Sequence, residues 1–437
     1  MDDQFRLRRL RQARLPGVLL GVLTLLIVSV GVGDVDKGFV PEPNDPAIEY
    51  TSRPTNDLIS VLNRDIKAGK VRLRFDGRQG YLPSVLKALH VPIESQMAVF
   101  SKTSVQAQRI SPQNPRTLFF NDSLAIGWVH GGFIEAAAQD PRQGVIFYVL
   151  EQIPSEPPQF TRHNDCLNCH NSNNAMGVPG MLIRSQFTAP NGTTMPWLGN
   201  YVTDHRSPLE ERWGGWYVTG RTGAIRHMGN AVVVDATNPE SIVTDQTLNL
   251  QSLAGRIDNA AYLSPYSDIV ALMVFEHQMH MMNLLTRIGW QTRYLLRNGN
   301  ARDLQTTGLS ASVEDLVDYM LFVDEPPLRT RIEGTSGFAQ KFSAEGRHDR
   351  RGRSLRQFDL EHRLMRYPCS YMIYSDVFDA LPSEAKNAIY ERLWLILSGA
   401  STNAKYVHLS AADRQAVLEI LRETKKQLPD YFQLGAR

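Results

Sequence analysis

Three residues with reactive side chains stand together in the segment Cys166-Leu167-Asn168-Cys169-His170. This Cys-x-x-Cys-His spacing is typical of covalent c-type haem attachment. The gap of two residues lets one turn of chain place both thiols at one edge of a porphyrin, where they add across its two vinyl groups. The next residue, His170, would then ligate the iron from the proximal side. The sequence therefore predicts one covalent haem c, bound through Cys166 and Cys169 and ligated by His170.

Two other chemistries use similar residues. A zinc site could draw on His163, Cys166, Cys169 and His170, but such sites normally pair two separated ligand couples, and one couple is missing here. A thioredoxin-like dithiol would need its first cysteine at a strand-to-helix junction, and residues 157–164 do not have a strand pattern. Zinc and dithiol chemistry stay as alternatives to haem.

The ligand on the other side of the haem is not defined by any motif. His277 lies at the centre of the apolar face of a predicted helix, where a histidine must be hydrogen-bonded or bind something. We therefore keep it as a candidate distal ligand of the iron, with Met228 and Met281 as further candidates. If the sixth position is open, His277 or His280 could act with Glu276 as acid–base groups on a bound peroxide.

The third cysteine, Cys369, has no partner within the chain if the other two hold haem. It is expected as a small buried residue. A reactive thiol and a weak iron ligand are the alternatives. Three cysteines also exclude a disulfide scaffold.

The N-terminus has the pattern of a signal peptide or signal anchor. Five arginines within residues 1–14 precede an uncharged run from Leu15 to Gly33. At ~1.5 Å per residue, this run just spans a ~30 Å hydrocarbon core. The preceding arginines place the N-terminus in the cytoplasm and the body outside it. The expected location is the bacterial inner membrane with the body in the periplasm, or the periplasm if the leader is cleaved. Haem c is attached after export, so the two features agree.

Composition excludes several classes. The 437 residues are 42% hydrophobic and 21% charged, with a net charge of +2, which excludes wholesale disorder and fibrous repeats. Most of the positive excess lies in the leader, so the body is nearly neutral and gives no reason to expect nucleic-acid binding. A second arginine-rich run, residues 347–356, is expected as a solvated loop.

The order of predicted elements indicates an α+β fold. We divide the chain into a leader (1–34), a Pro-rich linker (35–55), a β-rich haem-attaching region (56–260) and an α-helical region packing on it (261–437). The predicted strands are Val71–Phe75, Met97–Ser101, Arg116–Phe120, Leu124–Val129 and Gly144–Leu150, with a hairpin joining Trp216–Thr219 to Ala224–Met228. The predicted helices are Asp57–Lys67, a long helix capped by Ser267, one after a capping box at Ser312, Ser383–Leu397, and one capped by Ser410.

Several stretches together resemble a family of large bacterial exported proteins with one cytochrome c motif, described only as cytochrome c domain-containing. The resemblance covers roughly residues 95 to 430. The stretches that carry it are Phe119-Phe120-Asn121-Asp122, Gly127-Trp128-Val129, Asp165–His170, Gly177-Val178-Pro179-Gly180, Arg212–Gly220, Glu276-His277-Gln278 and Tyr367-Pro368-Cys369-Ser370-Tyr371. It implies haem binding and electron transfer outside the cytoplasm, and no known substrate. The resemblance assigns a functional role to three positions, Cys166, Cys169 and His170.

The favoured function is one-electron transfer with a redox partner protein or a quinol-linked donor, at a membrane reached through the N-terminal segment. A haem enzyme of the peroxidase type with an open distal site is the first alternative, and a haem-based sensor or assembly protein is the second. Electron carriers manage with about 100 residues, so the length of this chain favours the alternatives mildly.

Overall fold

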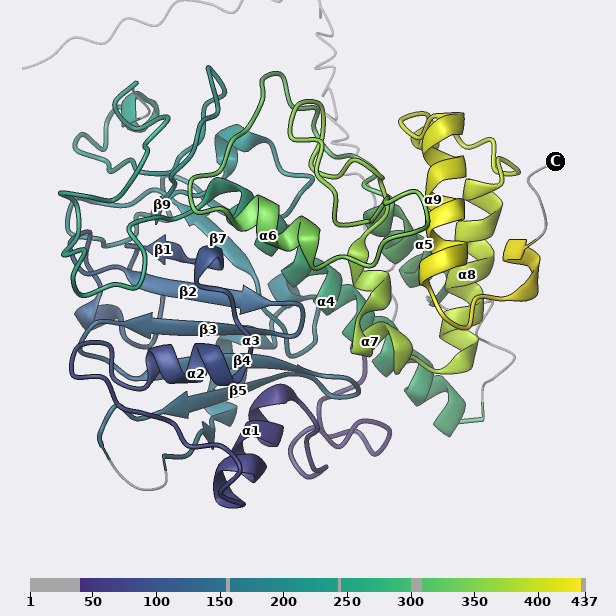
Figure 1. Ribbon diagram of the computed structural model, residues 1–437, viewed down its shortest axis with the longest axis horizontal. Helices are drawn as coiled ribbons and strands as arrows, with labels where there is room; N and C mark the ends of the chain where they lie inside the picture. The colour runs from purple at the N-terminus through teal and green to yellow at the C-terminus, as the bar shows by residue number, and fades with distance from the viewer. Residues whose placement is uncertain (1–39, 155–157, 243–244, 300–308, 434–437) are drawn as a thin grey trace, which may run out of the picture. The chain divides into compact units, whose positions relative to one another are not determined.

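One antiparallel sheet dominates the first half of the chain (Figure 1). The computed structural model describes residues 40–154, 158–242, 245–299 and 309–433. Seven strands pair in the order β6-β5-β4-β3-β2-β1-β9. Their bounds are Met97–Val99 (β1), Arg116–Asn121 (β2), Leu124–Val129 (β3), Ile134–Asp140 (β4), Gly144–Leu150 (β5), Thr161–Arg162 (β6) and Trp216–Tyr217 (β9). A separate two-stranded ribbon joins β7 (Ile183–Gln186) to β8 (Asn200–Thr203).

Helices cover both faces of this sheet. Successive residues of a strand point to opposite faces, so the side chains of Phe119 and Phe120 lie on the two faces of the sheet. Phe119 packs with α1 (Leu58–Lys67) and α2 (Leu82–Ala88) in one core cluster. Phe120 packs on the other side, with its ring centroid 5.0 Å from that of Phe275. Because both faces are covered, β3 is buried at every position, which explains its continuous apolar sequence.

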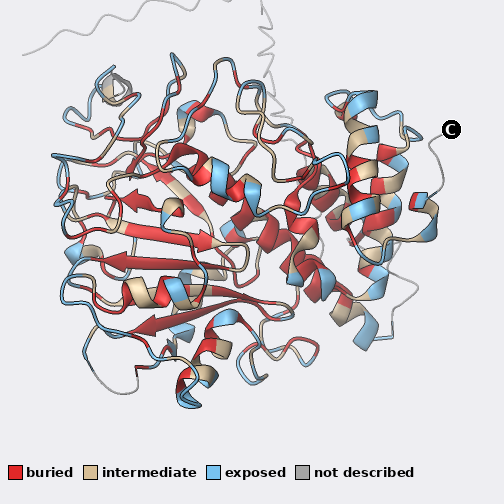
Figure 2. Cartoon of the chain, viewed as in Figure 1, coloured by how far each residue is buried: buried red, intermediate tan, exposed pale blue. Residues whose placement is uncertain are grey.

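The long helix α4 (Ile269–Arg297) is buried along most of its length, as Figure 2 shows. Its N-cap is Asp268, whose Oδ1 accepts hydrogen bonds from the backbone N–H groups of Val270 and Ala271 at 2.8 and 3.2 Å. The predicted cap, Ser267, is one residue too early. Its hydroxyl instead donates to the carbonyl of Tyr217 at 2.6 Å, which fixes β9 beside the start of α4.

The regular elements described in the rest of the second half are helices, which confirms the α+β prediction at that level: a sheet first, then helices. Ser410 caps its helix as predicted, in a capping box with Asp413. The further helices are α5 (Leu309–Met320), α6 (Phe338–Ala344), α7 (Asp376–Asp379), α8 (Ser383–Leu397) and α9 (Ala411–Thr424). Besides α1 and α2, the first half contains the short helix α3 (Leu167–His170).

Further local predictions are wrong. Residues 157–164 do contain a short strand, β6, because Thr161–Arg162 pairs with β5. Residues 71–75 are not a strand, because the backbone N–H of Arg74 bonds the Ser84 side chain at 3.0 Å instead of a neighbouring strand. The hairpin predicted at 216–228 does not form, since Trp216–Tyr217 pairs with β1. Ser312 does not cap a helix, because it is buried inside α5. The sequence also gave no prediction of β4.

The predicted leader, residues 1–34, lies outside the described residues. Of the predicted linker, residues 40–55 are described, and they pack on the body rather than extending away from it. Ile48 and Tyr50 are buried, and the Tyr50 hydroxyl donates to the carbonyl of Val145 at 2.7 Å. No helix in the described part of the chain combines the length and hydropathy of a membrane span.

Candidate functional site

The two motif cysteines lie on one helical turn. A 3₁₀ turn over Asn164–Cys166 runs directly into α3, so the backbone is helical through the whole motif. Residues three apart on a helix project to the same side. Cys166 is half-buried, Cys169 is exposed, and both are free thiols. The local structure therefore presents the two cysteines on the same side of one helical turn.

His170 is held in one orientation by its own loop. Its Nδ1 lies 3.0 Å from the carbonyl oxygen of Gly180, and the backbone N–H of Gly180 bonds the His170 carbonyl at 2.9 Å. A carbonyl can only accept, so Nδ1 carries the proton and Nε2 keeps a lone pair. Burial lowers the pKa of His170 below 6.5, which keeps the ring neutral near pH 7, as a metal ligand must be.

The loop that carries Gly180 is fixed by α4. Asn283 donates to the carbonyl of Met181 at 2.7 Å and accepts from its N–H at 3.2 Å. Glycine is required at position 180, because a Cβ there would lie 2.2 Å from Oδ1 of Asn283. On the other side, the N–H of Val145 in β5 bonds the carbonyl of Pro179 at 3.0 Å. His170 is thus anchored between β5 and α4.

The surroundings of the motif combine a sheet face with polar atoms that lack partners. The His170 ring packs on Phe147 of β5, with centroids 4.7 Å apart. Beyond the motif, Asn171 Oδ1 and Ser172 Oγ are buried without a hydrogen-bond partner in the described chain. Two adjacent thiols, a free imidazole nitrogen and unsatisfied polar atoms beside them fit a covalently bound haem.

The zinc alternative gains no such support. Among residues 40–433 as described, no group of three or more His, Cys, Asp or Glu side chains is placed to hold a metal ion. His163, Cys166, Cys169 and His170 are therefore close in sequence without forming a ligand set.

His277, the candidate distal ligand, is a fully buried histidine with both ring nitrogens engaged. Nδ1 lies 2.8 Å from Nδ1 of His205, and Nε2 lies 2.7 Å from the Ser370 hydroxyl. Its ring stacks on Phe322 at 4.6 Å. Asn283, which holds the loop of Gly180 and Met181, lies six residues further along α4, a rotation of about 120° around the axis. The structure therefore places His277 on a different face of α4 from the side chain that anchors this loop.

His277 belongs to a larger, partly buried group that the sequence did not reveal. We call it the α4 polar cluster; it consists of Asp204, His205, Arg206, Arg212, Glu276, His277 and His280. Arg212 Nη1 lies 3.3 Å from Glu276 Oε2, and Thr203 donates to Oε1 at 2.6 Å. Burial raises the pKa of Glu276 to about 7 in spite of the Arg212 charge. Residues 204–212 lie far before α4 in the sequence and have no periodic pattern. The sequence therefore did not predict that they contact Glu276 and His277.

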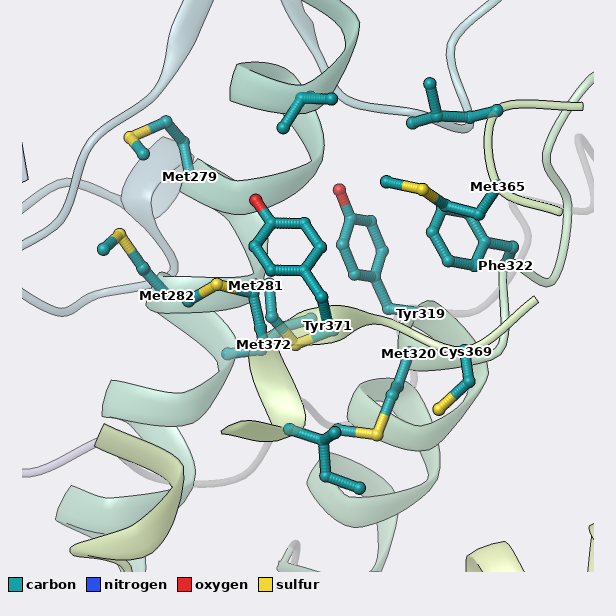
Figure 3. Packing of buried hydrophobic residues seen from close by; sticks show 14 of the residues in the cluster. Met279, Met281, Met282, Tyr319, Met320, Phe322, Met365, Cys369, Tyr371 and Met372 are labelled. Carbon is teal, nitrogen blue, oxygen red and sulfur yellow. The ribbon is translucent and has the colours of Figure 1, made fainter. Parts of the chain in front are cut away.

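The remaining candidates are core residues. Met228 is buried, and its sulfur accepts from the Ser185 hydroxyl at 3.7 Å. Cys369 is fully buried in the cluster that holds Met281, Met320 and Tyr319 (Figure 3). Burial raises the pKa of the Cys369 thiol to about 12, so its reactive thiolate form is strongly disfavoured.

Comparison with family models, with curated proteins and with solved structures finds no match to this chain. The site's own geometry is therefore the basis for assigning a function.

Proposed function

We propose that the protein is a c-type cytochrome that binds one haem covalently and transfers single electrons outside the cytoplasm. The observation that carries this proposal is the orientation of His170. Its Nδ1 is committed to the carbonyl of Gly180, so Nε2 is the free nitrogen, on the residue that directly follows Cys169 and lies one helical turn after Cys166. A Cys-x-x-Cys-His sequence in any other conformation would give weaker support.

Each residue then has one task. Cys166 and Cys169 hold the haem through thioether bonds, and His170 ligates its iron. The haem supplies one-electron redox chemistry when bound. Gly180 and Asn283 act through His170 and its loop. They fix the imidazole plane and keep its proton on Nδ1. The partner is expected to be a redox protein or a quinol-linked donor, with membrane attachment through the N-terminal segment and no role for nucleic acid.

The peroxidase-like alternative needs an acid–base group free to act on a bound peroxide. The candidates His277, His280 and Glu276 all lie in the α4 polar cluster. His277 has partners on both nitrogens, and Glu276 is bound by Arg212 and Thr203. The engagement of His277 and Glu276 within the core favours electron transfer over peroxide chemistry.

The test is expression of the full chain in the bacterial periplasm together with a c-type haem maturation system. We expect a haem-staining band that survives denaturing electrophoresis, and a mass increased by one haem. The variant with Cys166→Ser and Cys169→Ser should lose the band, whereas Cys369→Ser, a matched thiol outside the motif, should retain it. A chain without covalent haem after maturation would refute the proposal.

Optical spectra of the ferric and the ferrous protein separate the two functions. A six-coordinate low-spin haem that responds neither to peroxide in the ferric state nor to CO in the ferrous state supports the electron carrier. A high-spin haem that binds either ligand supports the enzyme and contradicts the carrier.

A further inference from the structure

Four arginines converge on one hollow far from the motif in sequence. A cavity of about 380 Å³ is lined by Arg53, Arg142, Arg293 and Arg297, with Glu49 as its acidic residue and Pro46, Ala47 and Leu296 as its apolar wall. The arginines come from three separate segments: the stretch before α1, the β4–β5 turn, and the last turns of α4. Folding therefore brings together like charges that the sequence keeps apart.

These charges are only partly neutralised. Arg53 pairs with Glu49. Within the part of the chain that the structure describes, Arg142, Arg293 and Arg297 form no ion pair. Asp140 is the other nearby carboxylate, but its oxygens are already bonded to the backbone N–H groups of residues 56, 142 and 143. Burial, and then the charge of Arg142, lowers the pKa of Arg293 to about 10. The hollow therefore has a surplus of positive charge.

The guanidinium groups are also held in place with donors to spare. Arg142 Nη2 donates to the carbonyl of Ala47 at 3.3 Å, and Arg293 Nη2 donates to the carbonyl of Ala380 at 2.9 Å. The Nε of Arg53 is buried without a partner among the described residues. Each guanidinium has five N–H donors, so most of them remain available. Gly289 makes room for one of these groups, because a Cβ there would lie 2.7 Å from Nη1 of Arg293.

We propose that this hollow binds a phosphate-class oxyanion, either free inorganic phosphate or the phosphodiester of a lipid headgroup. Arginine forks match the paired oxygens of phosphate, and several forks around one hollow can contact several oxygens at once. An anion there would neutralise the surplus charge. A lipid source is reasonable because the wall at residues 46–53 follows the apolar N-terminal segment in sequence. This site is independent of the haem proposal.

The experiment measures thermal unfolding of the full chain in detergent with two probes, inorganic phosphate and glycerophosphoglycerol. The second probe is a lipid headgroup without acyl chains, so the apolar leader does not contribute to its binding. Ionic strength is held constant with chloride, because screening alone weakens repulsion between arginines. We expect either probe to raise the Tm in a saturable way. A response to phosphate alone identifies the free ion, and a response to the diester identifies the headgroup.

Three variants make the test specific. Arg142→Gln and Arg293→Gln should each weaken binding roughly tenfold or more, because each removes a charged donor. Gly289→Ala retains every charge but displaces Arg293, so it should also weaken binding while the protein stays folded. Arg351→Gln is the matched control, since Arg351 lines a different hollow and pairs with Glu419 at 2.9 Å. Equal responses in all four variants and the wild type, or no response beyond chloride, would overturn the proposal.

Discussion

Replacing Glu276 by Gln should change how stability depends on pH. Glu276 is fully buried within the α4 polar cluster, and burial raises its pKa from 4.5 to about 7. Between pH 4.5 and about 7, a carboxyl with this raised pKa binds more protons in the folded state than in the unfolded state. Its contribution to stability is therefore fully present below pH 4.5 and is lost as the pH rises through 7.

The size of the effect follows from the shift. Each pKa unit corresponds to about 1.4 kcal/mol, so a shift of this size is worth about 3 kcal/mol of unfolding free energy. Other groups titrate with the opposite sign. Burial lowers the pKa of His277 to about 3 and that of His227 to about 4, so these histidines stabilise the fold as the pH rises towards 6.5. These histidines are present in both proteins, so their contribution cancels when the unfolding free energy of wild type is subtracted from that of the variant at each pH.

The assay is urea unfolding of wild type and Glu276→Gln, followed by circular dichroism at intervals from pH 4.5 to 8. We expect the free energy of the variant, relative to wild type, to rise by about 3 kcal/mol across this range. Glu314→Gln is the control. Burial would raise the pKa of Glu314, but hydrogen bonds from Arg392 and Lys405 lower it overall, so its titration lies below this window. Parallel curves for wild type and Glu276→Gln would refute the reasoning.

Three further outcomes are expected. In denaturant, the matured protein should show one titratable thiol, Cys369, and none when folded; three thiols in denaturant would contradict haem attachment. Gly180→Ala should destabilise the fold by about 1–3 kcal/mol, because its Cβ would strike Asn283, and an unchanged urea midpoint would disprove that clamp. Ser370→Ala should cost about 1–3 kcal/mol by leaving a buried nitrogen of His277 without a partner; a loss below about 0.5 kcal/mol in urea unfolding would show that the bond contributes little.

Local sequence signals predicted the elements whose causes are local. The apolar run Leu124–Val129 became β3 with the predicted bounds, and Ser410 capped α9 through its own side chain. Strand β4 could not be predicted this way. Its Ala-Ala-Ala segment has a high helix propensity, but pairing in register with both β3 and β5 makes it a strand.

In the candidate site, too, local sequence patterns predicted some residues, and long-range packing adds the others. The motif Cys166–His170 identifies its residues by spacing alone. The spacing does not identify the groups that orient the motif. Asn283 is over a hundred positions away and is one polar residue in a mostly apolar helix. The contact of His205 with His277 is equally distant in sequence, with a separation of 72 residues. Only the packing of α4 brings either pair together.

The position of Asn283 has a consequence for biogenesis. The chain emerges from its N-terminus, so the two thiols of α3 become available before the clamp on Met181 exists, with 102 residues between the two halves of that clamp. The segment of Cys166 and Cys169 is therefore unanchored on its α4 side during the interval in which a maturation system would meet it. Completion of α4 then fixes the loop. Under the haem proposal, α4 would therefore fix this loop only after the motif itself has been synthesised.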